Sequence, residues 1–269
     1  MSETSPHVPS GPVPVSQGGR RLLDLIRVQA LLRAPGGCPW DAEQTHRSLA
    51  RHLLEETHEL LEAIDADDSD AIREELGDLL LQVTFHAQIA ADDGRWDVDD
   101  VAEGLVEKLI HRHPHVFGDV DVSGADEVLV NWEKLKTQEK GDVPVEDDIP
   151  PTLPALARAA KVQRRAASRG FEWRSVGSAL AALREEVDEL ADAIDAGDAT
   201  NAEEEVGDVL FSVVAIARKL GVDGESALRR TTRGFAERYG RFAAAVSGRG
   251  LDPETMSESE VRALFREMR

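Results

Sequence analysis

An internal duplication constrains the fold of this chain more than any other feature. Residues 53–64 read LLEETHELLEAI, and residues 183–194 read LREEVDELADAI. The segment EELGDLL at 74–80 returns as EEVGDVL at 204–210. Both pairs are offset by 130 residues, from 53 to 183 and from 74 to 204. Because the two segments keep one register, the sequence predicts two related domains rather than two acidic stretches that are alike by chance.

Apolar side chains in both copies recur at the three- and four-residue spacing of an amphipathic helix. Leu53, Leu60 and Ile64 follow this spacing in the first copy, and Leu183 and Leu190 follow it in the second. Few segments show the strict alternation that is typical of strands. The sequence therefore predicts an all-α chain of two tandem helical-bundle domains.

Proline, glycine and acidic residues indicate the limits of the two domains. Residues 1–19 are rich in Ser, Pro and Gly and are predicted to be a disordered tail. Residues 141–153 contain three prolines in an acidic stretch that a helix cannot cross, so they are predicted to be a linker. The first domain is then expected at 20–140 and the second at 154–269.

The acidic excess limits the partners of the chain. It contains 52 acidic and 31 basic residues, for a formal net charge of -21. Nucleic acid and anionic lipid would be repelled, whereas divalent cations would be attracted. No apolar run approaches the roughly 20 residues that span a bilayer. The single cysteine, Cys38, excludes an intramolecular disulfide and fits a reducing cytoplasm. We expect a soluble cytoplasmic protein that binds neither nucleic acid nor membranes.

Each copy carries five carboxylates in the pattern E-E-x-x-E followed by E-x-x-D. In a helix, the first and last Glu of E-E-x-x-E lie about 40° apart, and the middle one flanks them at about 100°. The Glu and Asp of E-x-x-D also share a face. A polar turn separates the two helices, so an antiparallel hairpin would bring the acidic faces together. The predicted metal-binding and catalytic residues are Glu55, Glu56, Glu59, Glu75, Asp78, Glu185, Glu186, Glu189, Glu205 and Asp208.

These acidic faces could be merely solvated, but the second helix of each copy argues for a metal site. It continues as LLLQVTFHAQIA or VLFSVVAIARKL, which predicts extensive burial. Buried carboxylates are costly unless they are paired or bind a metal, and no cluster of Lys and Arg accompanies them. Oxygen ligands favour Mg²⁺, with Mn²⁺ as a substitute. The His-rich stretch 111–115 suggests zinc, but its proline interrupts the helical spacing and no thiol joins it. Gly77 and Gly207 share one register and predict close helix packing beside the site.

Magnesium held by a few carboxylates is a common arrangement for handling substrate phosphates. A carboxylate that is not fully used as a ligand could accept a proton from the attacking water. Basic residues should then contact the remaining phosphate oxygens. Lys108 and Arg112 are the candidates in the first copy, and Lys161, Arg164 and Arg238 are the candidates in the second.

With these residues in place, the sequence resembles the MazG family of all-α nucleoside triphosphate pyrophosphohydrolases over about residues 20–269. The motifs that carry the resemblance include GCPWDAEQTH (37–46), LEETHELLEAI (54–64), RHPHVFGD (112–119), NWEKLK (131–136) and LPALARAAKVQRRAASRGFEW (153–173). The resemblance implies cleavage of NTPs or dNTPs between the α- and β-phosphates, giving a nucleoside monophosphate and pyrophosphate. It also implies a homodimer with Mg²⁺ at the carboxylates. Trp40, before the first acidic helix, is a candidate for packing on the nucleobase, with a role as a loop anchor as the alternative.

The second copy departs from the family pattern at one place. Where second copies commonly read N-x-K-F, this chain has Thr232, Arg233, Gly234 and Phe235. We expect both clusters to bind metal, and the sequence supports catalysis by the first copy more strongly than by the second. The alternatives are a narrower dUTPase-like or phosphoribosyl-ATP-type pyrophosphatase, a non-catalytic nucleotide-sensing protein, and a purely structural acidic bundle. The cellular role would be nucleotide-pool sanitation or stress-related nucleotide control.

Overall fold

A computed structural model describes most of the chain. The described residues are 20–124, 127–128, 131–132, 135, 144–147 and 149–268. The predicted tail at 1–19 lies outside the described residues, as do parts of the predicted linker and of the NWEKLK motif. Within the described residues the chain is helical and has no strand, which confirms the prediction of an all-α fold. It divides into two compact units, Met1–Lys136 and Thr137–Arg269.

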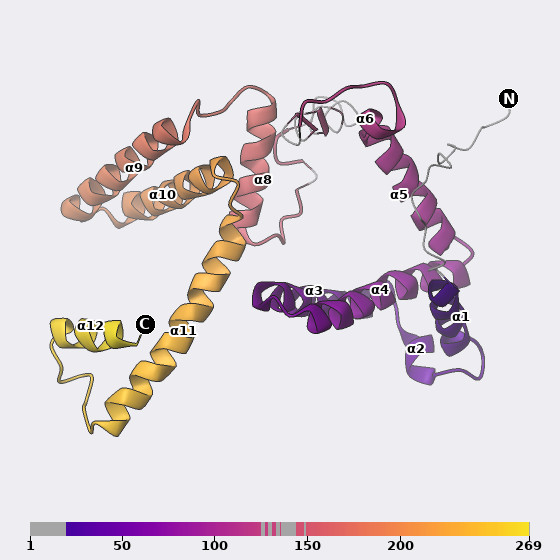
Figure 1. The fold of residues 1–269 in the computed structure, drawn as a ribbon, viewed down its shortest axis with the longest axis horizontal. Helices are drawn as coiled ribbons and strands as arrows, with labels where there is room; N and C mark the ends of the chain where they lie inside the picture. Colours follow the sequence, from indigo (N-terminus) through magenta and orange to yellow (C-terminus); the bar gives the residue numbers. More distant parts are fainter. Residues whose placement is uncertain are drawn as a thin grey trace. The chain divides into compact units, whose positions relative to one another are not determined.

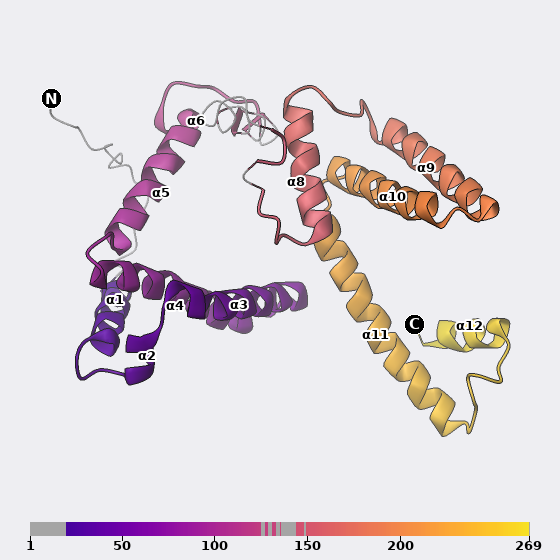
Figure 2. The same ribbon diagram turned by 180° about the vertical axis from the view of Figure 1, so that it is seen from behind.

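The first unit is built around a helical hairpin. Its helices are α1 (Arg20–Arg33), α2 (Pro39–Glu43), α3 (His46–Ala66), α4 (Ser69–Asp92), α5 (Val98–Arg112) and α6 (Pro114–Phe117). Helices α3 and α4 run side by side and antiparallel in both views (Figures 1 and 2). Helix α1 packs against α4, and α2 lies in the connection between α1 and α3.

The second unit repeats this hairpin. Its helices are α8 (Ala155–Ser168), α9 (Val176–Ala196), α10 (Ala199–Lys219), α11 (Gly224–Gly248) and α12 (Glu258–Glu267). Helices α9 and α10 form the antiparallel pair, α8 packs on α10 and α11, and α12 packs on α11 (Figure 1).

The caps of α3 and α9 explain why these two helices have the same length and register. Helix α3 begins with a capping box at Thr45, and α9 begins with one at Ser175, 130 residues later. Helix α3 ends at Asp67 and α9 at Gly197, and both residues adopt left-handed backbone angles, with φ of 55° and 69°. The duplication therefore includes the turns and caps as well as the acidic helices.

Each unit has a small apolar core away from its hairpin turn. Leu49, Phe85 and Ile89 pack together in the first unit. Phe242 and Leu264 belong to the core that joins α11 to α12 in the second. None of the described helices is long and apolar enough to cross a membrane.

The extensive burial expected for α4 and α10 is found only in part. Leu76 and Leu80 of α4 are 51% and 40% exposed, and Val206 and Leu210 of α10 are 46% and 49% exposed. Leu53 and Ile64, which follow the amphipathic spacing of α3, are exposed as well. Apolar side chains of both hairpins are therefore exposed to solvent in the single chain.

Candidate metal centre in each unit

The hairpin of the first unit brings three carboxylates together. Glu56 comes from α3, and Glu75 and Asp78 come from one face of α4. One oxygen atom from each of these side chains lies within 4.8 Å of the other two, and all three residues are half-buried. We call this group the first cluster.

The second unit repeats this arrangement. Glu186 of α9 and Glu205 and Asp208 of α10 form the second cluster, in which one carboxylate oxygen from each lies within the same 4.8 Å. Glu186 and Glu205 are half-buried, whereas Asp208 is exposed. The Oε2 atom of Glu205 is buried and has no hydrogen-bond partner among the described residues. A buried carboxylate oxygen without a donor is costly, so this atom points to a cation as its missing partner.

The proximity of these carboxylates opposes their ionisation. Partial removal from water, followed by the nearby charges of Asp78 and Glu59, raises the pKa of Glu56. Partial removal from water and the charges of Asp208 and Glu189 raise the pKa of Glu186 in the same way. A divalent cation would relieve this repulsion in both units. Clustered carboxylate oxygens suit a hard ion such as Mg²⁺ or Mn²⁺, so the residues fit the metal that was expected.

A seven-residue spacing explains why Glu56 and Glu186 enter the clusters. Seven residues are close to two full helical turns, so residues at this spacing lie on one side of a helix. Leu49 and Ala63 are buried and flank Glu56 at seven residues on either side. Ala179 and Ala193 flank Glu186 in the same way. The seven-residue spacing can be read from the sequence, but the burial of its flanking residues, which identifies the glutamate that faces the second helix, comes from the structure.

The remaining glutamates of E-E-x-x-E lie outside the two clusters. Glu59 and Glu189 are close enough to raise the pKa values of cluster members, but neither belongs to a three-residue group. Glu55 is exposed, and its Oε2 lies 3.1 Å from Nδ1 of His52. Glu185 is exposed, and among the charges that raise the pKa of Glu186 its contribution is the smallest.

The expected phosphate-facing cations have different surroundings. Lys108 is exposed on α5, and Arg112 is half-buried at the end of that helix. Lys161 is half-buried on α8. Arg164 is exposed and helps to lower the pKa of the helix cap Asp223, after the hydrogen bonds from Ser226 to that carboxylate.

Arg238 lies against α12. Its guanidinium carbon is 4.1 Å from the ring centre of Phe265, and its Nε is buried without a hydrogen-bond partner in the described part of the chain. The stretch 232–235, where the family lysine is missing, is one to two turns earlier on the same helix. The structure thus shows Arg238 in a cation–π contact with Phe265 within the second unit.

Trp40 is both anchored and accessible. Its ring makes edge contacts with His52 and Phe85, at centroid distances of 6.2 Å and 6.4 Å, while 51% of the residue remains exposed. Trp173 occupies the corresponding loop of the second unit, two residues before the cap Ser175, and was not among the expected site residues. The GFEW motif was the signal for it.

A histidine pair next to Trp96 was not expected from the sequence. Nδ1 of His46 lies 2.8 Å from Nδ1 of His86, and the two rings are stacked. Arg95 donates to Nε2 of His46, so the Nδ1 of that ring carries the proton and donates to His86. Burial and the neighbouring His46 lower the pKa of His86. His46 is 40 or more positions before His86, Arg95 and Trp96 in the sequence, so no local pattern brings it to them.

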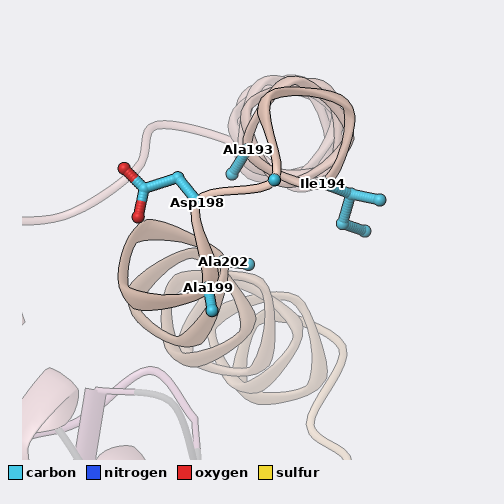
Figure 3. Close-up of a pocket in the computed structure, with 6 residues that line it drawn as sticks. Ala193, Ile194, Asp198, Ala199 and Ala202 are labelled. Atoms are coloured by element: carbon cyan, nitrogen blue, oxygen red, sulfur yellow. The ribbon is translucent and has the colours of Figure 1, made fainter.

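Two other features were compared with the clusters. The prediction of close packing at Gly77 and Gly207 is wrong within the chain, because a Cβ at either position would meet no atom within 4 Å. A shallow depression lies at the α9–α10 turn, lined by Ala193, Ile194, Gly197, Asp198, Ala199 and Ala202 (Figure 3). Its one charged residue, Asp198, already caps α10. None of its lining residues belongs to the second cluster.

Comparison with known proteins gives consistent matches along the chain. The profile of the MazG nucleotide pyrophosphohydrolase domain matches residues 44–117 and 174–241, which begin 130 residues apart. The nucleoside triphosphate pyrophosphohydrolase of Escherichia coli K12 is 44% identical over 87% of this chain and 93% of its own length. The Thermotoga maritima nucleoside triphosphate pyrophosphohydrolase/pyrophosphatase MazG is 44% identical over 88% of this chain and 91% of its own. The Mycobacterium tuberculosis nucleoside triphosphate pyrophosphohydrolase is 48% identical over 59% of this chain and 48% of its own length.

Proposed function

This chain belongs to the MazG nucleotide pyrophosphohydrolase family, and we propose that it hydrolyses nucleoside triphosphates to nucleoside monophosphates and pyrophosphate. The observation that carries the proposal is the three-carboxylate cluster, which recurs on the same hairpin in both units. Cleavage between the α- and β-phosphates of NTPs or dNTPs is the reaction that the family relationship suggests.

The proposed cofactor is Mg²⁺, for which Mn²⁺ could substitute. The three members of each cluster would hold it, namely Glu56, Glu75 and Asp78 in the first. When bound, a divalent cation would offset the charge of the triphosphate and make a nearby water molecule more acidic. Glu59 lies beside the first cluster without belonging to it, so its carboxylate is the proposed proton acceptor in the first unit. Glu189 has the same position in the second.

We propose that the first unit carries most of the activity. Lys108 and Arg112 would contact phosphate oxygens there, and Trp40 would pack on the base. In the second unit Lys161 and Arg164 remain candidates, but the contact of Arg238 with an aromatic ring supports a weaker phosphate site. We propose domain limits of 20–140 and 154–269, with one cluster in each domain.

Assays of Glu59→Gln and Glu189→Gln, with pyrophosphate release as the readout, test this assignment. We expect Glu59→Gln to remove most of the turnover and Glu189→Gln to remove little. If Glu189→Gln alone abolished turnover, the roles of the two units would be reversed. A panel of NTPs and dNTPs would separate a broad enzyme from a dUTPase-like one. Binding of nucleotide without turnover by the unaltered protein would favour the nucleotide-sensing alternative.

We further propose that the protein acts as a homodimer in the cytoplasm, in nucleotide-pool sanitation or stress-related nucleotide control. The exposed apolar residues of both hairpins, such as Leu76 and Leu210, support association of two copies. The single cysteine supports a reducing compartment. Sedimentation equilibrium would test the dimer, and a monomeric mass at micromolar concentration would contradict it.

A further inference from the structure

Arg33, at the end of α1, holds the loop that leads into the first acidic helix. Its Nε lies 2.7 Å from Oδ2 of Asp92, at the end of α4. One terminal nitrogen donates to the backbone oxygens of Asp41 and Gln44, at 2.6 Å and 3.2 Å. Only 9% of the Arg33 side chain is exposed. One largely buried guanidinium therefore fastens the α2 loop to two helices of the unit, and charge-assisted bonds of this kind are strong.

The same contacts fix the backbone of Trp40. The side chain of Gln44, whose carbonyl Arg33 binds, donates to the backbone oxygen of Trp40 at 2.9 Å. It also accepts from the hydroxyl of Ser48 in the first turn of α3, at 2.7 Å. The Arg33 guanidinium lies 5.7 Å from the ring centre of Phe85, and Phe85 in turn contacts the Trp40 ring. Arg33 thus supports Trp40 through its backbone and through its ring.

Trp40 lies near the first cluster. Its ring contacts His52, and His52 precedes Glu56 by one turn of the same helix, about 6 Å along the axis. A nucleotide whose phosphates reach the first cluster could therefore place its base on the exposed part of the indole. Stacking of a base on an aromatic ring needs a rigid partner, because any ordering of the loop on binding reduces affinity.

We propose that Arg33 is a positioning residue for the nucleobase, because it holds Trp40 ready to stack before the nucleotide arrives. This inference rests on the proposed function of the first unit. The contacts of Arg33 are with Asp92, the backbone oxygens of Asp41 and Gln44, and the Phe85 ring, none of which belongs to the first cluster, so its effect should appear only with ligands that carry a base.

The second unit fastens its tryptophan loop with the charges reversed. Glu172, within the loop, pairs with Arg218 at 2.6 Å and with Lys219 at 3.2 Å, both at the end of α10. Its carboxylate also accepts from the backbone N–H of Trp173 at 2.9 Å. In both units a residue that is ion-paired with the end of the second hairpin helix also binds the tryptophan segment, through backbone oxygens in the first unit and through the Trp173 N–H in the second. Two different solutions to the same task support a requirement for a fixed loop.

The test measures binding, so it does not depend on turnover. The parent for all measurements is the full-length protein with the substitution Glu186→Gln, which removes one of the proposed metal-binding residues of the second cluster. The two probes, each with Mg²⁺, are an α,β-methylene analogue of ATP and inorganic pyrophosphate, and calorimetry gives the dissociation constants. Arg33→Lys keeps the charge opposite Asp92 but loses the planar fork that reaches two carbonyls. Arg27→Lys, on the exposed part of α1, is the matched control.

We expect Arg33→Lys to weaken binding of the analogue about tenfold, a loss in the range for one base–aromatic stack. Binding of pyrophosphate should stay within about twofold of the parent. Trp40→Ala should have the same effect, and adding Arg33→Lys to it should weaken binding no further. Equal losses for both probes, or additive effects of the two substitutions, would overturn the inference. If the parent protein bound neither probe, both the proposed function of the first unit and the inference about Arg33 would be wrong.

Discussion

The choice of Glu56 over its neighbour Glu55 gives a sharp test of the metal site. Both are glutamates on α3, and Glu→Gln removes one negative charge at either position. Glu56 belongs to the first cluster, whereas Glu55 contacts His52 and is exposed. We expect Glu56→Gln to abolish the stabilisation of the first unit by Mg²⁺ and Glu55→Gln to preserve it. Both variants carry Glu186→Gln, so that only the first cluster responds.

The size of the effect follows from the size of the unit. A ligand at one hundred times its dissociation constant stabilises the folded state by about 2.7 kcal/mol. With about 120 residues, the first unit should unfold with an entropy of about 0.25 kcal/mol per kelvin at its midpoint. Saturating Mg²⁺ should therefore raise the midpoint by about 11 °C in the parent and in Glu55→Gln. Loss of the exposed contact of Glu55 with His52 should cost at most about 1 kcal/mol.

Scanning calorimetry in EDTA and in Mg²⁺ measures these shifts. In EDTA, Glu56→Gln should melt no lower than the parent, because the substitution removes a carboxylate whose pKa is raised by partial burial and by Asp78 and Glu59. In Mg²⁺ it should melt well below the parent. A full Mg²⁺ shift in Glu56→Gln, or its loss in Glu55→Gln, would refute the assignment of the cluster.

Three further predictions concern pH and packing. Without metal, the free energy of unfolding of Glu56→Gln should exceed that of the parent by an amount that grows as pH rises from 4.5 through the raised pKa of Glu56. The reason is that the carboxyl of Glu56 stabilises the fold only while it is protonated, at lower pH. Urea titrations in EDTA measure this difference. Burial and His46 lower the pKa of His86, so its stabilising effect should be present above pH 6.5 and be lost as pH falls through the lowered value, and His86→Gln should flatten this dependence in urea melts at pH 7.5 and 5.5. Gly37→Ala should destabilise the first unit by about 1–3 kcal/mol, because a Cβ there collides with two backbone oxygens of α1, whereas Gly104→Ala in open space on α5 should stabilise it by up to about 1 kcal/mol, as thermal melts would show.

The hairpins could be predicted from the sequence because their signals are local. The E-x-x-D spacing places Glu75 and Asp78 on one face of a helix whatever the rest of the chain does. The 130-residue register then predicts the second hairpin from the first. The structure agrees with both, and the caps at Thr45 and Ser175 extend the repeat beyond the residues that revealed it.

The rotation of α3 about its axis was harder to predict. Adjacent residues differ by about 100°, so Glu55 and Glu56 were equally plausible ligands from the acidic spacing alone. Burial of Leu49 against Phe85 decides between them, because it turns Glu56 toward α4. The support of Trp40 was also missed, since Arg33 and Asp92 are 59 residues apart and meet only in the folded unit.

The reversed ion pairs of the two tryptophan loops also bear on how the duplicated copies can change. Near-identical repeats in one chain can exchange segments by recombination. A hybrid unit in which the first-unit loop was joined to α10 would leave Arg218 without Glu172. The copies have therefore ceased to be interchangeable parts.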